Sequence, residues 1–259
     1  MGRVTTTSAT LDLWYHYGRR RAAVERGVPE DFRWAWVQDV QDAGPGAEVL
    51  GDLTGLCVAD LGAGAGRHAA YLAVRHRPGR VDAVDASAAQ HAMARDLFAD
   101  RVPCLRLVHA DVVAHLRTAP GAYDVLFSVF GALDFTDPRD LLPLAAAALR
   151  PGGRLVFSTL AHYPSGERAE ADVTHADVSA RGPNGEPATM RRWVLREHVW
   201  VGLLEEAGFA DIDVEVLPAS AESAPCAQGV ATLLLCARSA PHDGECWPGH
   251  PSTECSPRT

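Results

Sequence analysis

The stretch Val58–His68, VADLGAGAGRH, places Gly62, Gly64 and Gly66 within five positions, directly after a short apolar run. Glycine loses more conformational freedom on folding than any other residue, so this cluster indicates a turn where side chains would block the backbone or a ligand. The run before it has strand length, and Arg67–Val74 after it has helical composition. We therefore predict a strand, a glycine loop and a helix, an order that exposes backbone N–H groups to a nucleotide-like or anionic ligand group.

Length and charge restrict the class of protein. A chain of 259 residues suits one α/β domain with additions at its edges. A formal net charge of -9 gives no broad basic surface, which argues against nucleic acid and membrane as partners and favours a small-molecule ligand. All 24 basic residues are arginine, so lysine Schiff bases, phosphate loops with Gly-Lys-Ser/Thr and lysine general bases are excluded.

The ends of the chain indicate a cytoplasmic protein without a metal. Residues 1–10 have no apolar segment of a signal peptide, and the longest apolar run, 141–149, is too short to span a bilayer. The six cysteines have no spacing typical of a disulfide framework. A disordered tail over 239–259 is favoured over a zinc site, although the tail holds four residues with ligand-like spacing, His242, Cys246, His250 and Cys255.

From residue 49 to 238, short apolar strands alternate with helical stretches, which is typical of a mainly parallel sheet covered on both faces. We expect seven strands near 57–60, 80–84, 105–109, 122–129, 154–159, 212–217 and 229–236. We expect helices near 67–74, 88–98, 112–117, 138–149 and 197–207.

Two segments precede this domain, and an insertion lies within it. Residues 1–10 read as disordered, and 11–48 as a largely helical, aromatic-rich cap that either covers the site or packs on the core. Residues 161–190 are polar and too long for a simple connection. We interpret this insertion as a lid over an active site, with a surface loop as the alternative.

The spacing of the glycines bears on which ligand such a loop binds. Dinucleotide folds need a third glycine in G-x-G-x-x-G for close helix and strand packing, and Arg67 occupies that position here. The chain instead resembles the class I S-adenosylmethionine-dependent methyltransferases. The resemblance covers roughly residues 50–237 and rests on six motifs in the expected order: DLGAGAG (60–66), VDAVDAS (81–87), VHADV (108–112), YDVLFS (123–128), LRPGGRL (149–155) and LLEEAGF (203–209).

The resemblance implies a Rossmann-like fold, S-adenosylmethionine as cofactor and S-adenosylhomocysteine as product. Asp85, closing the second strand beside Ala86, would accept hydrogen bonds from both ribose hydroxyls; a helix cap is the alternative role. Asp111 would accept from the adenine amine, again with a cap as the alternative, and the Val112 backbone N–H would reach the adenine ring.

The resemblance also gives roles to the residues around the glycine loop. Gly62, Gly64 and Gly66 would let the backbone pass under the methionine portion, and Asp60 would orient the loop or the amino group. Ser128, ending the fourth strand, would lie beneath the ligand near the sulfonium. Asp82 and Asp124, by contrast, are expected to face solvent at strand edges and receive no chemical role.

The fourth motif narrows the acceptor. Methyltransferases of nucleobase amines or glutamine usually carry (Asn/Asp)-Pro-Pro-(Tyr/Phe) there, whereas this chain has Ser-Val-Phe-Gly at 128–131. That difference favours a small molecule, with Phe130, Leu133 and Phe135 either lining an apolar acceptor pocket or merely packing. For a general base we consider His162 first, because histidine titrates near neutral pH, and then His16, His175 and His198.

The sequence thus predicts a cytoplasmic methyltransferase, monomeric or homodimeric, that methylates oxygen or nitrogen, less readily carbon, of a small metabolite in specialised metabolism. Two alternatives stay open. Relatives on the same fold catalyse cyclisations, and a regulator or partner subunit would retain the cofactor pocket without turnover. Intact residues at 62, 64, 66, 85 and 111 argue against a decayed pocket but do not separate binding from transfer.

Overall fold

The protein is described by a computed structural model that covers residues 27–36, 44–181, 186–218 and 230–240 of the chain. Within these ranges no helix is long and apolar enough to cross a membrane. The same ranges hold no group of three or more His, Cys, Asp or Glu side chains placed to bind a metal ion. The four candidate ligands of the tail lie outside the described residues.

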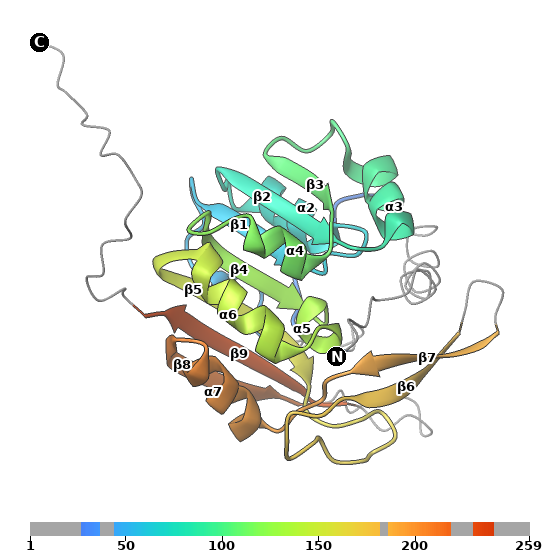
Figure 1. Ribbon diagram of the computed structural model, residues 1–259. Coiled ribbons are helices and arrows are strands. Elements are labelled where there is room, and N and C mark those ends of the chain that lie inside the picture. Colours follow the sequence, from blue (N-terminus) through green and yellow to red (C-terminus); the bar gives the residue numbers. More distant parts are fainter. Residues whose placement is uncertain (1–26, 37–43, 182–185, 219–229, 241–259) are drawn as a thin grey trace, which may run out of the picture.

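A seven-stranded sheet forms the centre of the structure, with the order β3-β2-β1-β4-β5-β9-β8 (Figure 1). Neighbouring strands from β3 to β5 run parallel, and β9 is antiparallel to both β5 and β8. The strands are β1 (Cys57–Leu61), β2 (Arg80–Asp85), β3 (Leu105–His109), β4 (Tyr123–Val129), β5 (Leu149–Leu160), β8 (Phe209–Leu217) and β9 (Thr232–Ser239). The predicted Rossmann-like, mainly parallel sheet is confirmed.

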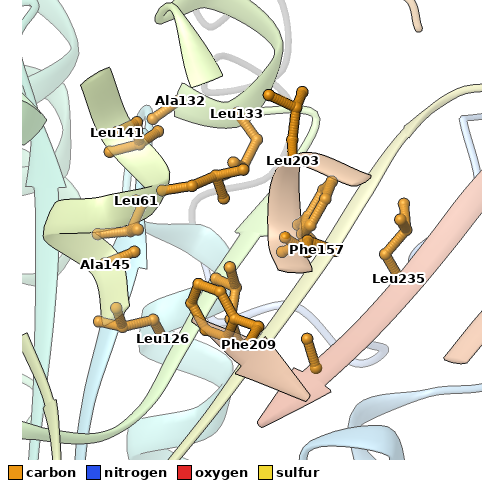
Figure 2. Packing of buried hydrophobic residues seen from close by; sticks show 14 of the residues in the cluster. Leu61, Leu126, Ala132, Leu133, Leu141, Ala145, Phe157, Leu203, Phe209 and Leu235 are labelled. Atoms are coloured by element: carbon orange, nitrogen blue, oxygen red, sulfur yellow. The ribbon is translucent and has the colours of Figure 1, made fainter. Parts of the chain in front are cut away.

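Helices cover both faces of the sheet, as the alternation of strands and helices predicted. The first two, α2 (Arg67–Arg75) and α3 (Ala88–Phe98), pack on one face. The opposite face carries α4 (Val112–Arg117), α6 (Pro138–Ala148) and α7 (Glu197–Glu206). Figure 2 shows the apolar core under these last helices, where Leu203 of α7 lies beside Phe157 of the sheet and Leu141 of α6 lies near Ala132.

The segment before β1 does not confirm the predicted helical cap. Residues 27–36 contain no helix, and only a short 3-10 turn, η1 (Ala47–Leu50), precedes the first strand; residues 11–26 and 37–43 lie outside the described part. Phe32 and Trp34 are buried instead, with ring centroids 5.8 and 6.4 Å from that of Phe127 in β4. Phe32 and Trp34, two of the aromatic residues expected in the cap, therefore serve as core on one face of the sheet, which agrees with the alternative that this segment packs on the core.

The expectation that Asp82 faces solvent is wrong. Strand β2 lies between β1 and β3, and the Asp82 side chain is fully buried. Its carboxylate accepts from Arg106 Nε at 2.9 Å and from the Tyr123 hydroxyl at 2.7 Å, and Arg80 lies 3.2 Å away. Asp124 is half-buried and accepts from the Cys57 backbone N–H at 2.8 Å. Both carboxylates fix strands at the amino end of the sheet, where arginines compensate their burial.

The insertion after β5 contains a two-stranded antiparallel hairpin formed by β6 (Ala176–Arg181) and β7 (Pro187–Arg192). It projects beside α5 (Ala132–Phe135), a one-turn helix after β4 that the sequence did not predict (Figure 1). Met190 of β7 packs with Phe135 of α5, so the hairpin is attached to the core at this point. The part of the insertion from residue 176 onward therefore has its own secondary structure.

Candidate functional site

A cavity of about 1020 Å³ opens at the carboxyl ends of the parallel strands. Its lining follows β1 (Gly62, Gly64), ends β2 (Asp85), follows β3 (Asp111) and follows β4 (Phe130). Ligands of open α/β sheets bind at this edge, where successive loops converge. The hairpin closes the other side of the cavity through residues of β6 and β7.

The glycine loop needs glycine for a steric reason at its first position. Gly62 has φ +80°, and a Cβ added there would lie 2.4 Å from the Ala132 backbone nitrogen. Its own N–H donates to Val84 O at 2.9 Å, which draws the loop over β2. Gly66, with φ +73°, instead caps the start of α2 and lies outside the cavity lining. Gly62 and Gly64 therefore provide the bare backbone at the cavity, and Gly66 provides the turn into the helix.

Asp85 holds the loop and faces the cavity. Its Oδ2 accepts from the Gly64 N–H at 2.7 Å, and its Oδ1 accepts from the Ser87 N–H at 2.8 Å. Burial raises the pKa of Asp85, while these two N–H groups and the charge of His109 act in the opposite direction. The N-cap of α3 is Ser87, whose hydroxyl accepts from Gln90 N, so Asp85 does not have the alternative cap role. Each Asp85 oxygen can accept a further hydrogen bond, for instance from a ligand hydroxyl.

Asp60 lies below the loop and is buried, with 2% of its surface exposed. No partner for Oδ2 exists within the described ranges. Burial and the nearby charge of Asp85 raise the pKa of Asp60 well above its ordinary value. Two carboxylates thus lie close together beneath a loop of glycines, an arrangement that a ligand cation would stabilise.

Asp111 and Val112 lie on the next loop along the sheet. Asp111 is exposed, lines the cavity and caps α4 by accepting from the Ala114 N–H at 3.0 Å. The alternative cap role is therefore present, and it leaves the side chain accessible to a ligand. Val112 is buried and lines the same part of the cavity, as does Ala86.

Ser128 and His162 are not among the lining residues. Ser128 is fully buried and donates to Leu61 O at 2.7 Å, so it joins β4 to the end of β1 under the loop. His162 places Nδ1 3.0 Å from Tyr163 O, and its Nε2 lies 3.4 Å from the Ala231 N–H. With both ring nitrogens facing backbone groups, His162 is poorly placed to accept a proton from an acceptor in the cavity.

The hairpin side of the cavity has a different character from the glycine side. It combines the aromatic residues Phe130, Phe135 and Trp193 with Met190. Leu133, which we expected beside them, is fully buried in the core instead. The polar lining on this side consists of Thr136, Asp137, Arg139, Asp140, His175, Asp177, Thr189 and Arg191.

Most of these hairpin-side residues escaped the sequence analysis. The insertion indicated a lid, but only the pairing of β6 with β7 shows which of its side chains reach the cavity. His175, an alternative to His162, is the histidine that lines the cavity, and its ring centroid lies 5.2 Å from that of Trp193. Among the polar residues on this side, Asp137 had a local sequence signal for its position, because an aspartate directly before a proline is typical of the start of a helix.

Comparison with known proteins agrees with this geometry. Residues 58–153 match the family model described as a methyltransferase domain. Trans-aconitate 2-methyltransferase of Paracidovorax citrulli is 32% identical over 142 residues, which are 53% of this chain and 52% of the relative. Ubiquinone biosynthesis O-methyltransferase of Sodalis glossinidius is 32% identical over 168 residues, 60% of this chain and 66% of the relative. The chain thus spans about half to two thirds of the curated relatives that it matches.

Solved structures share the fold at lower identity, and several are S-adenosylmethionine-dependent methyltransferases. The [4+2]-cyclase SpnF superposes with a TM-score of 0.60 at 18% identity, covering 93% of this chain and 99% of that chain. At this identity the likeness concerns the fold alone. The same fold therefore hosts both methyl transfer and cyclisation.

Proposed function

We propose that the protein methylates a small-molecule metabolite of specialised metabolism, because residues 58–153 match the model of a methyltransferase domain and the fold is shared with S-adenosylmethionine-dependent methyltransferases. The acceptor atom in this proposal is oxygen or nitrogen, and carbon is disfavoured. The observation that carries the proposal is the division of one cavity into a glycine and carboxylate side and an aromatic side. We place the protein in the cytoplasm, as a monomer or homodimer, with residues 49–238 as the working domain.

The residues of the glycine side fit S-adenosylmethionine, the cofactor of this family. The ligand carries two cationic groups and a ribose diol, and the site offers the buried carboxylate of Asp60 and the half-buried carboxylate of Asp85 beside a cradle that a Cβ at Gly62 would fill. In the proposal Asp85 accepts from the ribose hydroxyls, Asp111 and Val112 contact the adenine, and Gly62 and Gly64 pass under the methionine portion. Asp60 and Ser128 support the loop from below.

When bound, the cofactor supplies a methyl group on a sulfonium, a good leaving group. The chain then has to align the acceptor and exclude water. Holding two reactants in the right geometry can lower the activation barrier by about 7–11 kcal/mol. The aromatic side of the cavity serves both tasks. Where the acceptor is a hydroxyl or a protonated amine, His175 is better placed than His162 to take the proton, because it lines the cavity.

Release of S-adenosylhomocysteine tests the proposed function directly. The protein is incubated with S-adenosylmethionine and a panel of phenols, heteroaromatic amines and carboxylic acids, and the product is measured by mass spectrometry together with a mass gain of one methyl group on the acceptor. We expect both signals with at least one class, and weaker signals from the Asp85→Ala variant when the S-adenosylmethionine concentration does not saturate the protein. Conversion of a compound without S-adenosylhomocysteine would indicate a cyclase, and binding without any conversion a regulator.

A further inference from the structure

The hairpin side of the cavity is an apolar wall attached to the core. Met190 of β7 packs against Phe135 of α5, and Val178 and Ala188 of the hairpin extend the same cluster. Trp193, directly after β7, is 5% exposed and lines the cavity with them. Flat rings and a thioether therefore border the space opposite the glycine loop, a surface suited to a flat apolar ligand.

A buried ion pair fixes this wall in place. Arg192, at the end of β7, donates to Asp134 Oδ2 through Nε at 3.0 Å and through its terminal nitrogen. Asp134 is fully buried and Arg192 is 6% exposed. The Asp134 backbone carbonyl also accepts from the Trp193 N–H at 2.8 Å. One residue of α5 thus holds both the last residue of the hairpin and the tryptophan after it.

Aromatic rings bracket the guanidinium of this pair. The Arg192 Cζ lies 4.9 Å from the ring centroid of Trp36 and 5.2 Å from that of Phe135. Trp36 in turn packs edge-on to Phe130, with centroids 4.9 Å apart. Because Phe130 and Phe135 both line the cavity, the position of Arg192 determines where two of its aromatic walls stand.

The charges around the cavity disfavour an anionic acceptor. Of the described residues that line it, five are aspartates and two are arginines. Arg139 makes two contacts to Asp137, at 3.0 and 2.6 Å, and Arg191 stands opposite Asp177 in the hairpin register. A di- or tricarboxylate in this cavity would be repelled by the aspartates, because the lining has fewer arginines than aspartates to balance the added negative charge.

We infer that the acceptor is an uncharged, flat aromatic compound bearing the hydroxyl or amine to be methylated, and that Arg192 and Asp134 are positioning residues for its binding wall. This inference rests on the proposed function and specifies its substrate class. Phe135, Met190 and Trp193 contact the acceptor. Arg192 acts through them and does not itself touch the acceptor.

Calorimetric titration of the protein loaded with S-adenosylhomocysteine tests the substrate class without turnover. The probes are 2-naphthol, which is flat and uncharged, and trans-aconitate, a tricarboxylate. We expect 2-naphthol to bind at least 10-fold more tightly. The Phe135→Leu variant should weaken 2-naphthol binding at least 5-fold, whereas the matched Phe98→Leu variant, buried on α3 away from the cavity, should leave it unchanged.

The positioning role is tested with Arg192→Met and with the double variant Asp134→Leu/Arg192→Met, which leaves no unpaired charge buried. We expect both to weaken 2-naphthol binding at least 5-fold with S-adenosylhomocysteine affinity kept within 2-fold, and to speed hydrogen exchange in 187–192 but not in β1. Arg106→Met, which removes a partner of buried Asp82 at the far end of the sheet, is the control for loss of an ion pair.

Three results separate the possible failures. Tighter binding of trans-aconitate overturns the inferred substrate class. Wild-type 2-naphthol binding in the folded double variant, or equal losses of 2-naphthol and S-adenosylhomocysteine affinity, overturns the positioning role. Absence of any S-adenosylhomocysteine binding to the wild-type protein instead refutes the proposed function on which the inference rests.

Discussion

Replacing Asp85 by alanine should weaken cofactor binding and also lower the stability of the fold. The carboxylate accepts from Gly64 N at 2.7 Å and Ser87 N at 2.8 Å, so its removal leaves two backbone donors without this partner. Each unpaired buried group costs about 1–3 kcal/mol. The variant also removes a half-buried carboxylate whose pKa is raised by desolvation, and the relief of that desolvation cost offsets part of the loss. We expect a net loss of about 1–3 kcal/mol in the free energy of unfolding.

The change in cofactor affinity is the result that tests the ribose assignment. Charge-assisted hydrogen bonds to the ribose hydroxyls and the ordered Gly64 loop are lost together, which should cost about 1–3 kcal/mol of binding free energy. This loss corresponds to a rise in the S-adenosylhomocysteine Kd of about 5-fold to 150-fold. Titration calorimetry measures the Kd, and urea denaturation measures the free energy of unfolding.

Asp124→Ala is the matched control for this experiment. Asp124 also accepts a backbone N–H, that of Cys57 at 2.8 Å, and pairs with Arg150 at 2.5 Å, but it lies near the amino end of β4. Its loss should lower stability and leave the Kd within about 2-fold, because Asp124 is not among the residues that line the cavity. An unchanged Kd in a folded Asp85→Ala variant, or equal weakening by Asp124→Ala, would refute the ribose assignment.

Three further predictions follow from the same geometry. Gly62→Ala should lower the free energy of unfolding by more than about 3 kcal/mol, because the added Cβ would lie 2.4 Å from the Ala132 backbone nitrogen. The control Gly55→Ala, at φ +74° with open space around it, should lower it by only about 1–2 kcal/mol. Thermal denaturation measures both losses. The protein should release protons when S-adenosylhomocysteine binds, because the cationic amino group of the ligand favours the charged forms of Asp60 and Asp85, whose pKa values are raised above 3.8. The affinity should therefore increase as pH rises from 3.8 through these raised pKa values, the same range in which the unliganded fold loses stability. Calorimetry in buffers of different ionisation enthalpy measures the proton exchange, and proton uptake would contradict this prediction. His162→Ala should keep kcat within about 3-fold, because its ring nitrogens face backbone groups; a fall of about 100-fold in steady-state turnover would restore it as the general base.

The sequence was sufficient for the sheet because each strand and helix carried its own local signal. The glycines at 62–66, the apolar runs and the helix starts at Ser87 and Asp111 are local features, and the structure confirms the elements that they predict. Asp85 was identified for the same reason, since it ends a strand beside the glycine loop. Its hydrogen bond to Gly64 joins the end of β2 to the loop that follows β1, and these two strands are adjacent in the sheet.

Tertiary pairing decided the features that the sequence did not show. Asp82 was expected in solvent because its partner Arg106 lies 24 positions away, and Arg192 finds Asp134 across 58 positions. The composition of the segment before β1 suggested a helix. Phe32 and Trp34 of this segment instead pack against Phe127 as part of the core, in a stretch without a helix. The hairpin side of the cavity depends on the register of β6 with β7, which a polar insertion with Gly and Pro does not encode locally.

A crystal structure of the protein with S-adenosylhomocysteine tests the central claim most directly. The account predicts the ribose hydroxyls within hydrogen-bond distance of Asp85, the adenine beside Asp111 and Val112, and the sulfur facing the wall of Phe135, Met190 and Trp193. An adenine held against Trp193, or a ribose that does not contact Asp85, would contradict this division of the cavity.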